Sequence, residues 1–405
     1  MPNYGHAEFD HADTGFADGD NFVIQLDDDG KLWDAAHAQR VLDTVSRSAE
    51  STNTIVSVYV HGWHHNAAPG DADAAAFLEQ LEATRELLAG KPHVDTRLRL
   101  TGSGKLRVIG IYVGWRGKSL PMPLDYLTFW GRKAAAERVG QRDLAGFMQN
   151  LRSIHAGCGR RRPGARGGTF MGLVSVGRGL GGQVLFRATR AEFEQQLKAG
   201  VARSAAGRRP PEGGLGGYGD LVVLLNPAID ALQYELIHQL NSRMSYGRSQ
   251  PPRLLILSSA NAFGRRIFFP LARWLRAVLG GPAGAEDELR RTALGEHAPH
   301  RTHDIAPAYG RSAGDPVRRI HEHERSIDFD LTNVPSLGRF KLVPTGNHKL
   351  FSPFLVGHAD AAVIRSQGDA FEAALLDFVA DYLEVASAKS LIRGATPEER
   401  VQAVA

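Results

Sequence analysis

A glycine-rich turn in the middle of the chain has the residue pattern of a site for covalent chemistry. The stretch 171–189, MGLVSVGRGLGGQVLFRAT, begins with an apolar run that predicts a buried strand and continues after its glycines as a helix. Strand, sharp turn and helix form the nucleophile elbow, G-x-S-x-G, which presents a serine hydroxyl. Residues 177–181 read GRGLG, so Gly179 stands where the serine would stand. Because glycine has no side chain, this turn lacks the attacking atom.

A second glycine follows another predicted strand and could orient amides toward an oxyanion. Residues 54–60, TIVSVYV, are β-branched and apolar, as expected of a strand that is covered on both faces. The strand ends in His61-Gly62, and a glycine there lets the following backbone turn toward a developing negative charge. The predicted oxyanion and pocket residues are Gly62, Trp63, Arg178 and Leu180.

Three histidines flank this glycine and raise the alternative of a metal site. A zinc ion could be held by His61, His64 and His65, but no H-E-x-x-H helix or carboxylate partner lies near them in the sequence. His64 and His65 are therefore interpreted as polar loop residues. The sequence predicts no metal and no cofactor.

The elements that would position these residues alternate along the chain. A turn signal at residues 28–30 predicts a hairpin of opening strands, and Asp34 is expected to cap the first helix. Alternating apolar strands and amphipathic helices predict an α/β fold with a doubly wound, mostly parallel sheet. The further predicted helices are 71–88 and 370–383, and the further strands are 106–113, 220–225, 253–258 and 340–343.

The 405 residues are expected to form a single domain with helical insertions, because the alternation continues through most of the chain. The predicted parts are a tail at 1–20, one domain at 21–385 and a tail at 386–405, with a possible lid at 118–157 and a surface insertion at 280–335.

Composition narrows the expected partners. Apolar residues make up 43% of the chain, yet no apolar run approaches the ~20 residues that span a bilayer. The net charge of +4 lies in short arginine clusters without a basic helix or aromatic platform, which disfavours nucleic-acid binding. The one cysteine, Cys158, excludes an internal disulfide, and the acidic first residues do not form a signal peptide, so we expect a cytoplasmic protein. No protein partner is indicated.

The order of these motifs resembles that of the α/β-hydrolase superfamily, specifically its serine esterases and lipases. The resemblance covers residues 22–383 and extends to a bacterial group generally described only as predicted hydrolases. It rests on YVHGWHHN, IYVGWRG, SVGRGLGG, LVVLLNPA, RLLILSSANAFG and GHAD, in that order.

The resemblance implies where a catalytic triad would lie. In this superfamily the triad follows the order nucleophile, acid, histidine. The nucleophile position corresponds to Gly179 and the histidine to His358, which precedes Asp360 and the last predicted helix. His348 is the reserve candidate.

The acid position is also altered. Relatives tend to have an Asn-Asp pair after the strand at 253–258, whereas this chain has Asn261-Ala262, so Ala262 occupies the acid position without a carboxylate. The resemblance leaves Asp230, after the preceding strand, as the candidate acid.

Three functions follow from these residues. The leading hypothesis is a pseudo-hydrolase that binds a small ester-like or apolar ligand or a partner, because acylation at residue 179 needs an Oγ. The rival is an active ester or amide hydrolase whose natural form carries serine at Gly179. The third is phosphate or dinucleotide binding, since Gly177-x-Gly179-x-x-Gly182 also fits a dinucleotide fingerprint, although no acidic residue ends a second strand about twenty residues on.

Overall fold

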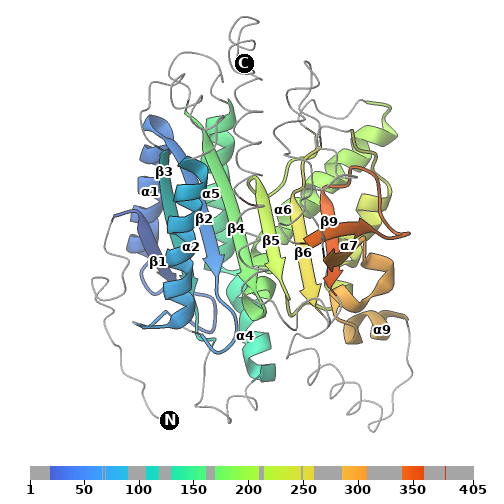
Figure 1. The fold of residues 1–405 in the computed structure, drawn as a ribbon, viewed down its shortest axis with the longest axis horizontal. Helices are drawn as coiled ribbons and strands as arrows, with labels where there is room; N and C mark the ends of the chain where they lie inside the picture. The colour runs from blue at the N-terminus through green and yellow to red at the C-terminus, as the bar shows by residue number, and fades with distance from the viewer. Residues whose placement is uncertain are drawn as a thin grey trace, which may run out of the picture.

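A largely parallel sheet runs through the residues that the computed structural model describes. These are residues 19–65, 67–68, 70–89, 106–117, 129–160, 169–208, 214–247, 250–259, 285–307, 340–359 and 379. Within them the sheet has nine strands in the order β1-β3-β2-β4-β5-β6-β9-β7-β8 (Figure 1). Neighbouring strands are parallel except for β7 and β8. The predicted doubly wound α/β fold is confirmed.

The central strands are apolar along their length because helices cover both faces of the sheet. β5, for example, reads LVVLL, and its first four residues are buried. The strands are β1 (Asn21–Gln25), β2 (Asn53–Val60), β3 (Leu106–Gly114), β4 (Met171–Arg178), β5 (Leu221–Leu225), β6 (Leu254–Ser259), β7 (His303–Pro307), β8 (Phe340–Pro344) and β9 (Phe354–Ala359).

The helices begin largely where the sequence predicts. Asp34 is the N-cap of the first helix, and its carboxylate accepts a hydrogen bond from the amide of His37 at 2.7 Å. The described helices are α1 (Ala35–Ser51), α2 (Ala72–Ala89), α4 (Phe129–Gln141), α5 (Asp143–Arg160), α6 (Leu180–Ala205), α7 (Ala231–Ser242) and α9 (Ala285–Arg291), with short 3-10 turns η3 (Leu294–Glu296) and η4 (Ala298–His300).

Two apolar layers lie on opposite faces of the sheet. One contains buried side chains of α1, α5, α6 and α7, and the other contains those of α2, including Phe77 and Leu81 (Figure 1). Right-handed crossovers explain the division, because the connection from β2 to β3 steps along the sheet in the direction opposite to that from β4 to β5. The strand order therefore reverses between β2 and β4, and ligands of open α/β sheets bind at such a switch point, beyond the carboxyl ends of the strands.

Three segments differ from the sequence-based expectation. Residues 280–335 were expected to be a surface insertion, but their described part supplies β7 and buries Leu294. The sequence predicts no strand around His358, but the segment forms β9, because its apolar run FLVGHA pairs with both β6 and β7. In the predicted opening hairpin, the second strand is reduced to one antiparallel bridge, between Leu26 and Leu32.

The predicted lid, 118–157, lies only partly in the described residues. Its described part, from residue 129 onward, comprises α4 and most of α5. α4 packs mainly on α6, and α5 packs on α1 and on β4, so both belong to the helical layer over one sheet face. Residues 118–128 lie outside the described part of the chain, and a role in covering the site stays a prediction for them.

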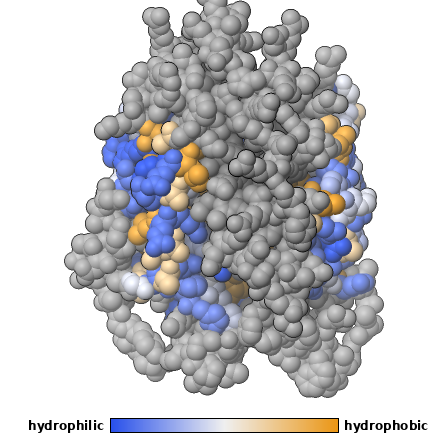
Figure 2. Space-filling view, viewed as in Figure 1, coloured by the Kyte–Doolittle hydropathy of each residue, from blue (hydrophilic) through white to orange (hydrophobic). Residues whose placement is uncertain are grey.

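The visible surface of the described residues is mixed in character. On the face shown in Figure 2, hydrophilic and hydrophobic side chains alternate. The exposed large hydrophobic residues of the described chain, Trp33, Val343 and Leu350, lie in separate segments. Among the helices that can be described, none combines the length and the hydropathy needed to cross a bilayer.

Candidate functional site

The elbow between β4 and α6 has the backbone of a sharp strand-to-helix turn. Gly179 has φ 58° and ψ −118°, a backbone conformation that residues other than glycine rarely adopt. Its amide donates to the carbonyl oxygen of Leu225 at 2.8 Å, and its own carbonyl accepts from the amide of Ala228 at 2.9 Å. Because these two bonds tie residue 179 to β5 and the loop after it, the surrounding structure imposes the unusual conformation.

The neighbouring glycines are required by close packing. A Cβ on Gly177 would lie 2.8 Å from the carbonyl oxygen of Gly181, and one on Gly181 would lie 2.2 Å from the carbonyl oxygens of Val60 and His61. A Cβ on Gly179, in contrast, would meet nothing within 4 Å. Gly177 and Gly181 therefore let α6 approach β4 and β2, whereas Gly179 between them faces open space.

The loop after β2, for which the sequence predicts oxyanion binding, lies directly against the elbow. A Cβ on Gly62 would lie 2.9 Å from the carbonyl oxygen of Arg178. Leu180 is the first residue of α6, and α6 has no side-chain cap because its N-cap is Gly179. The first amides of a helix have no acceptor within it, and Leu180 and Gly181 supply those of α6 at the carboxyl end of β4. The structure thus brings Gly62, Arg178, Gly179 and Leu180 together.

His61 positions this loop and is not a free base. The ring is fully buried, its Nδ1 donates to the carbonyl oxygen of Gly62 at 2.9 Å, and its Nε2 accepts from the amide of Trp115 at 3.0 Å. The Trp115 indole returns a hydrogen bond to the carbonyl oxygen of His61 and stacks on the imidazole. Burial lowers the pKa of His61 to about 4, so the ring is neutral at pH 7.

Metal binding by the three histidines is not supported. Both ring nitrogens of His61 are engaged, and Nδ1 of His65 lies 3.1 Å from Oδ1 of Asp71. His64 stacks on Trp63 with ring centroids 3.8 Å apart. Across the described residues, no group of three or more His, Cys, Asp and Glu side chains has a geometry that could hold a metal ion.

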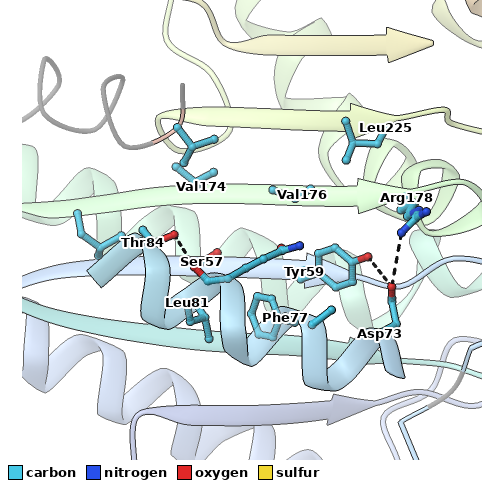
Figure 3. Close-up of a pocket in the computed structure, with 14 residues that line it drawn as sticks. Ser57, Tyr59, Asp73, Phe77, Leu81, Thr84, Val174, Val176, Arg178 and Leu225 are labelled. Atoms are coloured by element: carbon cyan, nitrogen blue, oxygen red, sulfur yellow. Dashed lines mark hydrogen bonds and ion pairs between the residues drawn. The ribbon is translucent and has the colours of Figure 1, made fainter. Parts of the chain in front are cut away.

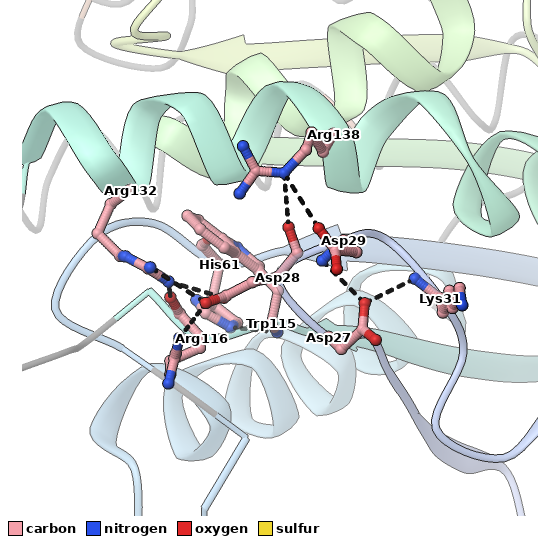
Figure 4. A network of polar contacts seen from close by, with 9 residues as sticks. All are labelled: Asp27, Asp28, Asp29, Lys31, His61, Trp115, Arg116, Arg132 and Arg138. Atoms are coloured by element: carbon pink, nitrogen blue, oxygen red, sulfur yellow. Dashed lines mark hydrogen bonds and ion pairs between the residues drawn. The ribbon is translucent and has the colours of Figure 1, made fainter. Parts of the chain in front are cut away.

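A cluster of acidic and basic side chains fixes the adjoining loop between β1 and α1 (Figure 4). The carboxylate of Asp28 accepts hydrogen bonds from Arg116, which follows β3, and from Arg132 of α4 at 2.7 Å. Burial acts to raise the pKa of Asp28, but the hydrogen bonds from Arg132 and Arg116 outweigh it, and the pKa is lowered. This ion-pair cluster holds the segment that carries Trp115, and thereby the partner of His61.

Asp230, the candidate acid, is the N-cap of α7. Its Oδ1 accepts from the amide of Gln233 at 3.1 Å and its Oδ2 accepts from the side chain of Gln233 at 2.8 Å. This capping role explains the residue without a triad. Ala262 lies outside the described residues.

The structure does not bring His358 to the elbow. The strand register aligns Arg178 with Leu225, Leu225 with Leu257, and Leu257 with Gly357. His358 is therefore level with Gly179 but separated by three strand spacings, roughly 14 Å, which exceeds the reach of an imidazole to a hydroxyl. His348, the reserve candidate, follows β8 at the far edge of the sheet, where its ring lies 4.7 Å from that of His303.

Two residues that sequence reasoning did not select lie beside Arg178. The hydroxyl of Tyr59 on β2 donates to Oδ1 of Asp73 on α2 at 3.1 Å, and Nη1 of Arg178 lies 3.9 Å from the same oxygen (Figure 3). Asp73 could have been suspected as an acidic residue at the start of the helix that follows the loop after β2. Its contact with Arg178 depends on the pairing of β2 with β4, which the sequence does not display.

Comparison with known proteins leaves the family of this chain open. No protein-family model, no curated protein and no solved structure matches it.

Proposed function

We propose that the protein binds a small ester-like or apolar ligand on a scaffold of α/β-hydrolase type that has lost its nucleophile. The observation that carries the proposal is the elbow. Gly179 has the backbone of a nucleophile turn and faces open space, while Gly177 and Gly181 are required by packing. The likeness to hydrolases is a fold-level analogy, so it bears on the scaffold and leaves the ligand to be identified.

Binding without hydrolysis follows from the side chains near the elbow. Residue 179 supplies no Oγ, so no acyl-enzyme can form there. The imidazole of His61 is committed to the Trp115 amide, and Asp230 is committed to capping α7. What the site retains is an open position framed by the oxyanion loop and the first amides of α6.

The second candidate is an active hydrolase whose natural form has serine at position 179. The open space at the Cβ position of Gly179 favours it, because a serine side chain would fit there without a clash. Both candidates predict that the present chain does not hydrolyse esters, and they differ in whether its serine variant reacts with a fluorophosphonate probe.

Ester turnover separates them. The chain as it stands is expected neither to hydrolyse p-nitrophenyl acetate and butyrate above the buffer rate nor to react with a fluorophosphonate probe. Gly179→Ser tests for a latent triad, with Gly179→Ala as the control that adds a Cβ without a hydroxyl. Labelling of the serine variant alone would favour the second candidate. Turnover by the unmodified chain at ordinary enzyme rates, on the order of 1 s⁻¹ or more, would overturn the proposal.

Binding is tested on the same variants. Short-chain carboxylates, alcohols and uncleaved esters are screened for a saturable increase in melting temperature, as expected of ligands that bind only the folded state. Gly179→Leu fills the open space and should abolish the increase, whereas Gly179→Ala has the same backbone strain and should retain it. If the two variants bind equally well, the ligand site is elsewhere.

A further inference from the structure

A cavity lies on the α2 face of the sheet, between α2 and strands β2 and β4 (Figure 3). It occupies about 60 Å³, and its lining residues include Arg178 but not Gly179. A space of this size holds a few waters or the reacting end of a small molecule. Its polar residues are Ser57, Tyr59, Asp73, Gln80, Thr84 and Arg178.

The feature that sets this cavity apart is a buried carboxylate with one unused oxygen. Asp73 is only 7% exposed, and its Oδ1 receives the hydroxyl of Tyr59. Oδ2 is buried and has no hydrogen-bond partner in the described residues. A buried charged oxygen without a donor is costly, so such a group in a native protein calls for a bound partner.

Arg178 compensates the Asp73 charge only in part. Its Nη1 lies 3.9 Å from Oδ1, beyond hydrogen-bond distance, and its side chain is 51% exposed. Because about half of the Arg178 side chain is in contact with water, its charge is screened and its attraction to Asp73 is weakened. The carboxylate therefore retains capacity for a second cationic donor at Oδ2.

The remaining walls favour an apolar body next to that donor. Tyr59 and Phe77 stack with ring centroids 5.4 Å apart, and aromatic faces attract cations. The other apolar lining residues include Leu81, Val174, Val176 and Leu225. Predominantly apolar walls with a few placed polar groups are typical of small-molecule sites.

We propose that this cavity binds a small primary amine with an apolar body, its ammonium group donating to Oδ2 of Asp73 and its body packing on Phe77, Val174 and Val176. An anion is disfavoured because it would lie against the Asp73 carboxylate. The proposal does not depend on what the elbow at Gly179 binds.

Calorimetric titration with three probes of the same size tests the chemistry. Benzylamine should bind saturably, benzyl alcohol more weakly, and benzoate not at all. Asp73→Asn keeps the shape of the side chain and removes its charge, so benzylamine should bind roughly ten-fold or more weakly to it. Equal binding of benzoate and benzylamine, or an unchanged benzylamine affinity in Asp73→Asn, would overturn the proposal.

A second variant keeps the test decisive if Asp73→Asn unfolds, since Asp73 also lies in the first turn of α2. Ala76→Leu fills part of the cavity with a larger side chain from α2 and leaves the carboxylate of Asp73 in place. It should therefore abolish benzylamine binding. Gly146→Leu, on the exposed side of α5, is the matched control and should bind benzylamine like the unmodified chain. Retained binding in a folded Ala76→Leu protein would place the amine elsewhere and refute the proposal.

Discussion

The α-carbon of Gly181 packs so closely on the end of β2 that a Cβ there would lie 2.2 Å from the carbonyl oxygen of His61. This contact joins the elbow helix to the loop after β2 at the point where the strand order reverses. The relative position of the two halves of the candidate site therefore depends on the absence of a single methyl group.

Gly181→Ala should destabilise the protein, because real Cβ atoms do not approach a backbone oxygen that closely. We expect a loss of at least about 2 kcal/mol in the free energy of unfolding, which is typical of overpacking against backbone. Urea unfolding followed by circular dichroism measures it. Gly146→Ala is the control, since that exposed helical position is open, and it should stabilise by about 0.5–1 kcal/mol. Equal effects of the two changes would contradict the packing argument.

Gly179→Ala should cost less than Gly181→Ala and for a different reason. The added methyl group meets no atom within 4 Å, so only the strain of a positive φ remains. Strained backbone of this kind costs on the order of 1–3 kcal/mol. The unfolding free energies of both variants, compared under the same conditions, check the ranking. A neutral Gly179→Ala would mean that the loop relaxes and that the elbow geometry is not imposed.

Asp28→Asn should weaken the ion-pair cluster that holds the loop before α1. The pKa of Asp28 is lowered, so its contribution is complete above its unfolded pKa, near 4, and is lost as the pH falls through the lower folded value. We expect a loss of about 1–2 kcal/mol at pH 7, measured by urea unfolding, and a smaller difference between variant and parent at pH 3. Asp29→Asn is the control, because that side chain is 67% exposed and should change stability by about 0.5 kcal/mol or less. A difference for Asp28→Asn that is unchanged at pH 3 would disagree with a role for the ionised carboxylate.

Acidification should destabilise the fold through His61. The unfolded imidazole gains a proton as the pH falls below about 6.5, whereas the buried ring stays neutral until about pH 4, so the unfolded state is favoured across that interval. From pH 7 to pH 5 this amounts to roughly 2 kcal/mol for one such ring. His300 and His303, with pKa values lowered by burial to about 4 and about 3, act in the same direction.

Unfolding free energies at pH 7, 6 and 5 measure the combined effect, and His61→Gln should have a shallower pH dependence than the unmodified chain. Imidazole NMR titration of the native protein provides a check that needs no variant. A His61 ring that titrates near pH 6.5 in the folded state would disprove the assignment.

Local patterns in the sequence were sufficient for the central strands, for the start of α1 and for the elbow. Apolar runs predicted the central strands, Asp34 predicted the start of α1, and GRGLG predicted the sharp turn at Gly179, because each depends on residues close together in the chain. No strand was predicted around His358, although its pairing with β6 on one side and β7 on the other makes it one.

Distances across the sheet were decided only by the tertiary structure. Motif order suggested that His358 meets residue 179, whereas strand order inserts β5 and β6 between them. The contact of Asp73 with Tyr59 and Arg178 likewise arises because β2 pairs with β4 while α2 crosses to the opposite face. The physical reason is that hydrogen bonding and burial along one segment are encoded locally, whereas the pairing of strands depends on how all the segments pack together.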